Sequence, residues 1–248
     1  MTEEPIYDEV ARRYGLEPIP ECVLRLTQLV SRQNGDLDEI AGFIDKDSAL
    51  RRQILRLANP HAETESDYTI RTVEQALMRN GIGCVLLLAM SAPLAEALIK
   101  TFHTMLSLKL ESLDARKVAP LPGSHLLGTI KFCGKASGQV FLRLSFDSAK
   151  QLAARVLGLD PKESADMDAA KDAVGELLNI MAGNFKSNLC DAGLECCRLE
   201  PPNVFSTSGF HTVVDPGCGL ERMAFSAPPI LLFVDARVNP WSQDTLTG

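Results

Sequence analysis

The sequence is poor in aromatic residues and in positive charge. Aromatics make up 6% of its 248 residues, with a single tryptophan, so the core must be mainly aliphatic. The net charge is −7, and because nucleic acids and anionic membranes are bound by patches of Lys and Arg, neither is expected as the main partner. A clean membrane span is also missing. Residues 81–99 are mostly apolar but contain Pro93 and Glu96, which predicts a buried helix.

Patterns typical of metal and redox sites are missing as well. The seven cysteines form no Cys-x-x-Cys pair, and we expect reduced thiols in apolar surroundings. Cys190, Cys196 and Cys197 lie close in sequence, but no histidine is near and their spacing fits no usual zinc pattern. The four histidines are scattered, so no His-based nucleophilic arrangement is predicted. The acidic N-terminus resembles no targeting peptide, and a cytoplasmic location is therefore expected.

The first hundred residues predict an all-helical bundle of short helices. Residues 21–33 have apolar positions at helical spacing and are stopped by Asn34-Gly35. The later helices have candidate N-terminal caps at Asp36, at Asp47 or Ser48, and at Thr72, where Gln75 completes a capping-box pattern.

Beyond residue 100 the signals alternate between helix and strand, which predicts an α+β domain. The expected helices are Thr101–Leu110, a helix capped by Asp147 and ended by Gly158, and a long helix from Asp166 to about Leu189. The expected strands are Thr129–Cys133, Gln139–Ser145, Phe210–Val214, Glu221–Ser226 and Ile230–Val234, the first two joined by a hairpin loop at residues 134–138.

The long helix has an unusual polar face. At about 100° per residue, Asp172, Glu176, Asn179 and Gly183 fall within roughly 60° of one another. The opposite side is apolar and should pack against the sheet. Glycine in a helix costs roughly 1 kcal/mol relative to alanine, and here it would let a partner's backbone approach the amide closely.

The pair Glu176 and Asn179 is weak evidence by itself. An exposed helix face is normally polar, and Glu-x-x-Asn arises by chance about once in a chain of this length. A second copy, Glu200-Pro-Pro-Asn203, does occur, but its two prolines prevent a helix, so its side chains cannot share a face.

A longer pattern strengthens the functional interpretation. Asp172-x3-Glu176-x2-Asn179 is followed, after 22 intervening residues, by Pro202. This resembles the signature of the CheC/CheX/FliY phosphatases, and the strand–helix segment 138–158 resembles the unit that precedes the motif helix in CheX. The resemblance covers about residues 95–248, and one copy of the motif is CheX-like. It implies a mainly antiparallel sheet packed on two long helices, and a homodimer formed through sheet edges.

The resemblance also implies a reaction and a partner. The partner is a phosphorylated, CheY-like response regulator in chemotaxis or two-component signalling, whose aspartyl phosphate is hydrolysed. Asn179 is implied to orient the attacking water and Glu176 to form a salt bridge with the regulator's active-site lysine. Asp172, Gly183 and Pro202 are supporting motif positions. No cofactor of the chain's own is implied, because the regulator brings its own Mg²⁺.

The N-terminal part resembles an HDOD domain, a helical relative of HD phosphohydrolases. The resemblance rests on segments such as 19–26, 36–41, 44–50 and 55–59, and it covers residues 7–100, about half the usual length of such a domain. We predict a truncated HDOD-like domain at 1–94 and a CheX-like domain at 95–248. No His-Asp dipeptide occurs, so metal-dependent phosphohydrolase activity is not expected. We expect this part to be a regulatory or protein-interaction module.

Two other functions remain open at this stage. The CheX-like part could bind a response regulator without hydrolysing its phosphate. Alternatively, the chain could be a signalling adaptor in which the HDOD-like part makes the main contact. An intact Glu176 and Asn179 count against the binding protein, whereas the low functional specificity of the HDOD-like segments leaves the adaptor open.

Overall fold

A computed structural model of the chain describes residues 36–59, 62, 64–80, 83–115, 117–134, 137–159, 165–191, 196–208 and 219–239. Its α-helices are α3 (Leu37–Ile44), α4 (Ser48–Ala58), α5 (Val73–Asn80), α6 (Gly83–Leu106), α7 (Phe146–Val156) and α8 (Met167–Asp191), and η1 (Glu65–Asp67) is a short 3₁₀ helix. The strands are β1 (Glu111–Leu113), β2 (His125–Gly134), β3 (Ser137–Ser145), β4 (Cys196–Leu199), β5 (Asn203–Thr207), β6 (Gly219–Ala227) and β7 (Ile230–Asn239). The predicted helix 21–33 and strand Phe210–Val214 lie outside the described residues.

The strands form one antiparallel sheet, as the sequence predicted. The order is β1-β6-β7-β3-β2-β4, and β5 pairs with β2 next to β4. Two hairpins, β2–β3 and β6–β7, make up its centre, and β3 and β7 join them. Two groups of described strands therefore border the sheet, β1 on one side and β4 with β5 on the other.

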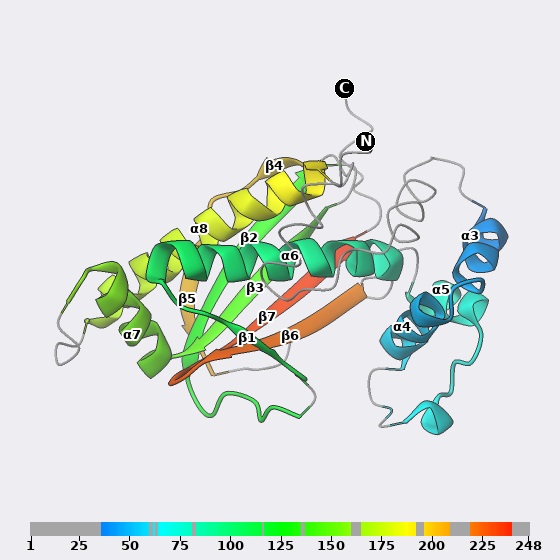
Figure 1. Cartoon of the computed structure of the whole chain (residues 1–248), viewed down its shortest axis with the longest axis horizontal. Helices are drawn as coiled ribbons and strands as arrows, with labels where there is room; N and C mark the ends of the chain where they lie inside the picture. The colour runs from blue at the N-terminus through cyan, green and yellow to red at the C-terminus, as the bar shows by residue number, and fades with distance from the viewer. Residues whose placement is uncertain are drawn as a thin grey trace, which may run out of the picture.

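Helices α6 and α8 lie together across one face of this sheet (Figure 1). The alternation along β3 explains this arrangement. Val140, Leu142 and Leu144 are buried in the core shared with the helices, so Phe141 and Arg143 between them point to the opposite face. Sheet and helices thus form the two layers expected of an α+β fold.

Helices α3, α4 and α5 gather beside the first part of α6 (Figure 1). Three predicted caps are confirmed: the side chains of Asp36, Asp47 and Thr72 accept from the backbone amides of Asp38, Leu50 and Gln75, respectively. Buried residues of these helices belong to the same core as the sheet layer. The N-terminal part therefore packs directly on the α+β part.

Several details of the sequence prediction were wrong. Ser145 caps α7 in place of Asp147, because the chain leaves β3 at that point and the Ser145 hydroxyl accepts from the amide of Ser148 at 3.0 Å. The predicted helix Thr101–Leu110 is the end of α6, which stops at Leu106 before Ser107 adopts a positive φ. Strands β1, β4 and β5 were not predicted, since each is short and stabilised by pairing with a distant segment.

Helix α6 is continuous through residues 94 and 95, where the sequence suggested a domain boundary. Its first part contacts α4 and α5, and it also packs on α8, β6 and β7. No helix in the part of the chain that the structure describes is long and apolar enough to cross a membrane. The boundary itself stays a prediction, but the two parts share this helix.

Candidate functional site

Helix α8 begins where the sequence predicted. The Asp166 carboxylate accepts from the amide of Ala169 at 2.7 Å, which satisfies one of the donors left open at a helix start. The apolar face is buried as expected: Val174, Leu177, Leu178, Met181 and Phe185 are each at most 1% exposed. Burial of this face fixes which residues α8 turns towards solvent.

The polar face of α8 is exposed. Asp172, Glu176, Asn179 and Gly183 are all exposed, and their spacing of four, three and four residues places them in one row along the helix. A Cβ atom added at Gly183 would meet nothing within 4 Å. The structure thus brings four of the five predicted site positions together on an open surface.

Polar contacts with α6 hold the C-terminal part of α8. The side-chain Nδ2 of Asn184 donates to the Thr101 hydroxyl at 3.0 Å, and that hydroxyl donates to the carbonyl of Ala97. Further along, the Asn188 side chain donates to the carbonyl of Pro93 at 3.2 Å. These bonds fix the rotation of α8 about its axis and so fix the direction of its exposed row.

The middle of α8 lies close to the sheet because a glycine is beneath it. A Cβ at Gly128 of β2 would come within 3.2 Å of Leu178 and 3.3 Å of Val174. We therefore expect Gly128→Ala to lower the free energy of unfolding by about 1–3 kcal/mol, the usual cost of overpacking. Urea denaturation measures this change.

Gly175→Ala is the matched control for Gly128→Ala. An added Cβ there would lie 3.7 Å from Val204 of β5, an ordinary contact, and alanine favours a helix. Equal destabilisation of the two variants would show that α8 is not held as closely at Gly128 as the structure indicates.

The fifth predicted position, Pro202, is on another element. It is half-buried and directly precedes β5, and Val204 of β5 lies beneath Gly175 of α8. Its place next to a strand that contacts α8 is compatible with a supporting role. In the second Glu-x-x-Asn copy, Glu200 directly follows β4 and Asn203 is the first residue of β5, so this copy forms no helical face.

Two family models match the chain. Residues 126–219 match the model of chemotaxis phosphatase CheX, and residues 16–119 match that of the HDOD domain. The α8 row lies within the first match. The region that contains α8 is CheX-like. The resemblance predicted from the sequence is confirmed in both parts, while no curated protein sequence matches the chain significantly.

Solved structures show the same fold for the CheX-like region. Chemotaxis protein CheX from Vibrio vulnificus matches with a TM-score of 0.51 and 23% identity over 60% of this chain and 96% of its own. A CheC-like superfamily protein from Shewanella sp. PV-4 matches with a TM-score of 0.51 and 24% identity over 60% of this chain and 97% of its own. CheX from Desulfovibrio desulfuricans matches with a TM-score of 0.50 and 18% identity over 60% of this chain and 99% of its own. These likenesses extend along almost the whole of each relative.

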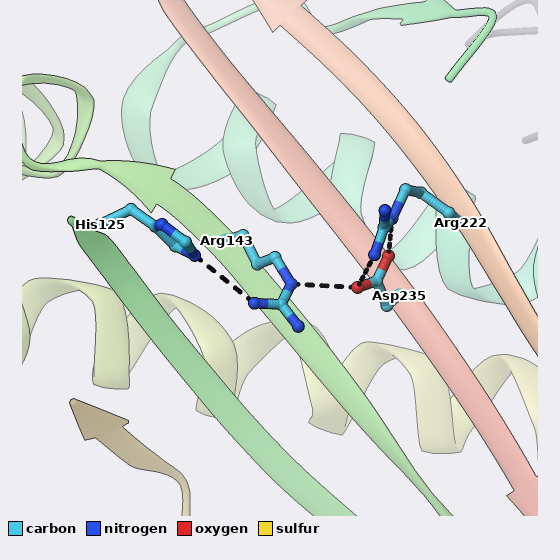
Figure 2. A network of polar contacts seen from close by, with 4 residues as sticks. All are labelled: His125, Arg143, Arg222 and Asp235. Atoms are coloured by element: carbon cyan, nitrogen blue, oxygen red, sulfur yellow. Dashed lines mark hydrogen bonds and ion pairs between the residues drawn. The ribbon is translucent and has the colours of Figure 1, made fainter. Parts of the chain in front are cut away.

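The opposite face of the sheet contains a buried polar network (Figure 2). Arg143 donates from Nε to Asp235 at 3.0 Å, and Arg222 donates to both oxygens of Asp235 at 2.6 and 2.9 Å. Arg143 is 2% exposed and Asp235 0%. These residues lie on β3, β6 and β7, so the network joins the central strands.

His125 completes this network through both of its ring nitrogens. Arg143 approaches its Nε2 at 3.4 Å, and because a guanidinium only donates, Nε2 accepts. Its Nδ1 faces the carbonyl of Gly123 at 3.2 Å. His125 is 0% exposed, so the network has a structural role. The network was not predicted from the sequence, although a lone arginine inside the apolar run 140–144 is a usable signal.

The α8 row offers limited but specific chemistry. Two carboxylates can bind cations, and an amide can both donate and accept, as needed to orient a water molecule. Serine, cysteine and histidine are absent from these four positions, so the row has no nucleophile of its own. Within the described ranges no three His, Cys, Asp or Glu side chains are grouped to hold a metal ion.

Proposed function

We propose that the CheX-like region is a phosphatase for the aspartyl phosphate of a response-regulator receiver domain. The observation that supports this most directly is the exposed row of Glu176 and Asn179 on a rigidly held helix inside a region that matches the chemotaxis phosphatase model. Docking would place this row against the phosphorylated aspartate of the partner.

Each of the two residues has a separate task in this proposal. An aspartyl phosphate is already activated, and hydrolysis needs chiefly a water molecule in line with the bond that breaks. Asn179 orients that water with its amide, because a carboxylate at the same place would repel the phosphoryl oxygens. Glu176 forms a salt bridge with the receiver's lysine, and the Mg²⁺ ion belongs to the receiver. Water then becomes bonded to phosphorus as the bond to the aspartate oxygen breaks, which releases the aspartate as a carboxylate and leaves the protons of the water on the inorganic phosphate.

A dephosphorylation time course tests the proposal. Several phosphorylated receiver domains from the same genome would be mixed with the full chain, and loss of phosphate compared with each receiver's own rate. Acceleration of at least one receiver is expected. If the chain binds receivers but accelerates phosphate loss from none of them, the enzymatic proposal is wrong and the chain is a non-catalytic binding protein. Absence of binding would favour the adaptor.

Gly183→Ala should affect the stability of α8 and the docking of a receiver in opposite directions. Nothing lies near an added Cβ and alanine favours a helix, so the free energy of unfolding should rise by up to about 1 kcal/mol. The same methyl group would hinder a receiver backbone beside Asn179, so the accelerated rate should fall severalfold. Thermal unfolding and the time course measure the two effects.

Ser187→Ala, one helical turn further along the exposed side of α8, is the control for Gly183→Ala. It should leave the accelerated rate unchanged. If Gly183→Ala keeps the full rate as well, close backbone approach at this position is not part of docking.

The predicted homodimer remains part of the proposal. Within the described strands, β1 pairs only with β6, while β4 and β5 pair only with β2. Pairing through either edge would leave the outer row of α8 accessible, because α8 lies across a face of the sheet. Sedimentation of the full chain at several concentrations would establish its oligomeric state.

A further inference from the structure

A second polar site lies in the HDOD-like part, away from α8. A cavity of about 280 Å³ opens beside the start of α4, and three arginines contribute to its lining: Arg51, Arg52 and Arg71. Among the described residues, Glu65 is the one acidic residue of the lining and Asp45 lies beside it as the partner of Arg51, so three arginines face two carboxylates, in a chain whose net charge is −7. We refer to this site as the arginine cavity.

Two of the three guanidinium groups are each held by a hydrogen bond to a backbone carbonyl. Arg51 donates from Nε to Asp45 at 3.1 Å and from Nη2 to the carbonyl of Arg71 at 3.2 Å. Arg71 donates from Nε to the carbonyl of Tyr68 at 3.1 Å. These bonds fix the side chains and leave further N–H groups of both guanidiniums for a ligand. Fixed donors bind an anion at a lower cost in side-chain entropy.

The third arginine is paired in a way that a ligand can displace. Arg52 contacts Glu65 at 3.2 Å, and the two side chains are 69% and 67% exposed. An ion pair so exposed contributes little stability, so an anion can compete with Glu65 for Arg52. Glu65 belongs to η1, which is ordered by Thr64 and Asp67: hydrogen bonds from Thr64 hold the pKa of the Asp67 carboxyl below its usual value.

The remaining lining limits the size and type of the ligand. Leu55 and Tyr68 provide apolar walls, and Ser48, the first residue of α4, contributes a hydroxyl donor. The volume is just below the range of about 300–1,000 Å³ typical of sites for drug-sized ligands. A compact anion with one or two additional groups fits better than a large cofactor.

We propose that the arginine cavity binds the phosphoryl group of a small soluble phosphorylated molecule. Guanidinium groups form paired N–H bonds with phosphate oxygens, and two fixed arginines with a third displaceable one match a group with several anionic oxygens. The cavity lies on residues 48–71, outside the CheX-like match at 126–219, so this proposal does not depend on phosphatase activity.

Calorimetric titration of the full chain with inorganic phosphate and with adenosine monophosphate tests the proposal. At constant ionic strength we expect saturable binding of at least one of them and none of chloride. Arg52→Gln should weaken binding about tenfold, the usual effect of losing one charge-assisted contact. Glu65→Gln should tighten binding severalfold, because it removes the competing carboxylate.

Arg79→Gln is the matched control for Arg52→Gln. Arg79 is an exposed arginine at the end of α5 that does not line the cavity, and its replacement changes the net charge equally. The affinity of the Arg79→Gln variant for the phosphorylated ligand should equal that of the unmodified chain. Absence of saturable binding would overturn the proposal, and so would equal weakening by Arg52→Gln and Arg79→Gln, which would indicate general charge attraction only.

Discussion

Asn179→Ala should reduce phosphate loss from a bound receiver to the receiver's own rate. If the amide positions the attacking water, its removal should cost about 100-fold or more of the acceleration, the effect expected when a reacting group is misplaced. Asn179 is exposed and its side chain makes no contribution to the buried face of α8, so the fold should be unchanged. The rate is measured with saturating full chain and a radiolabelled receiver phosphate.

The binding step distinguishes Asn179 from its neighbour on the row. Asn179→Ala should leave receiver affinity almost unchanged, whereas Glu176→Ala should weaken it by removing the salt bridge to the lysine. Asn203→Ala is the control, since Asn203 is an exposed asparagine in the other Glu-x-x-Asn segment. A normal rate in Asn179→Ala would contradict the assigned role of the amide.

Asp235→Ala should destabilise the chain by about 3–5 kcal/mol, because it removes the carboxylate that two arginines share and leaves the charge of Arg143 buried. Arg143 Nε and Arg222 Nε lie 3.0 and 2.6 Å from the oxygens of Asp235, whose side chain is 0% exposed. A loss of this size exceeds a third of the stability of many domains. Urea unfolding followed by circular dichroism measures it.

Arg222→Ala provides the comparison for Asp235→Ala. The Arg222 side chain is 30% exposed, so its loss leaves Asp235 still bonded to Arg143 and should cost markedly less. The double variant Arg143→Met with Asp235→Leu should recover a large part of the lost stability, since apolar residues can replace a buried pair. A cost below 1 kcal/mol for Asp235→Ala would show that the network is not a stabilising element.

Much of α8 was predictable because a helix repeats its environment every 3.6 residues. The period of its apolar residues identified the buried face, and the exposed face with Glu176 and Asn179 followed from the same geometry. Local chemistry also identified the caps Asp36, Asp47 and Asp166, since a cap bonds within three residues of itself. The sequence alone could not establish roles for the exposed residues.

Features that depend on distant pairing could not be predicted. Arg143 and Asp235 are 92 residues apart, and only the register of β3 against β7 brings them together. Strand β5 likewise exists because it pairs with β2, and its five residues have too weak a pattern alone. The arginine cavity combines residues of α4 with the segment 65–71, which no local pattern connects.

The continuity of α6 has a geometric consequence for how the chain can change. A helix advances about 1.5 Å and turns about 100° per residue, so inserting one residue in the middle of α6 would rotate the surfaces on its two sides out of phase. The surface towards α4 and α5 and the surface towards α8 could then no longer both be buried. Only insertions close to whole turns would keep both surfaces buried. The length of α6 is therefore restricted by its packing on α4 and α5 and on α8.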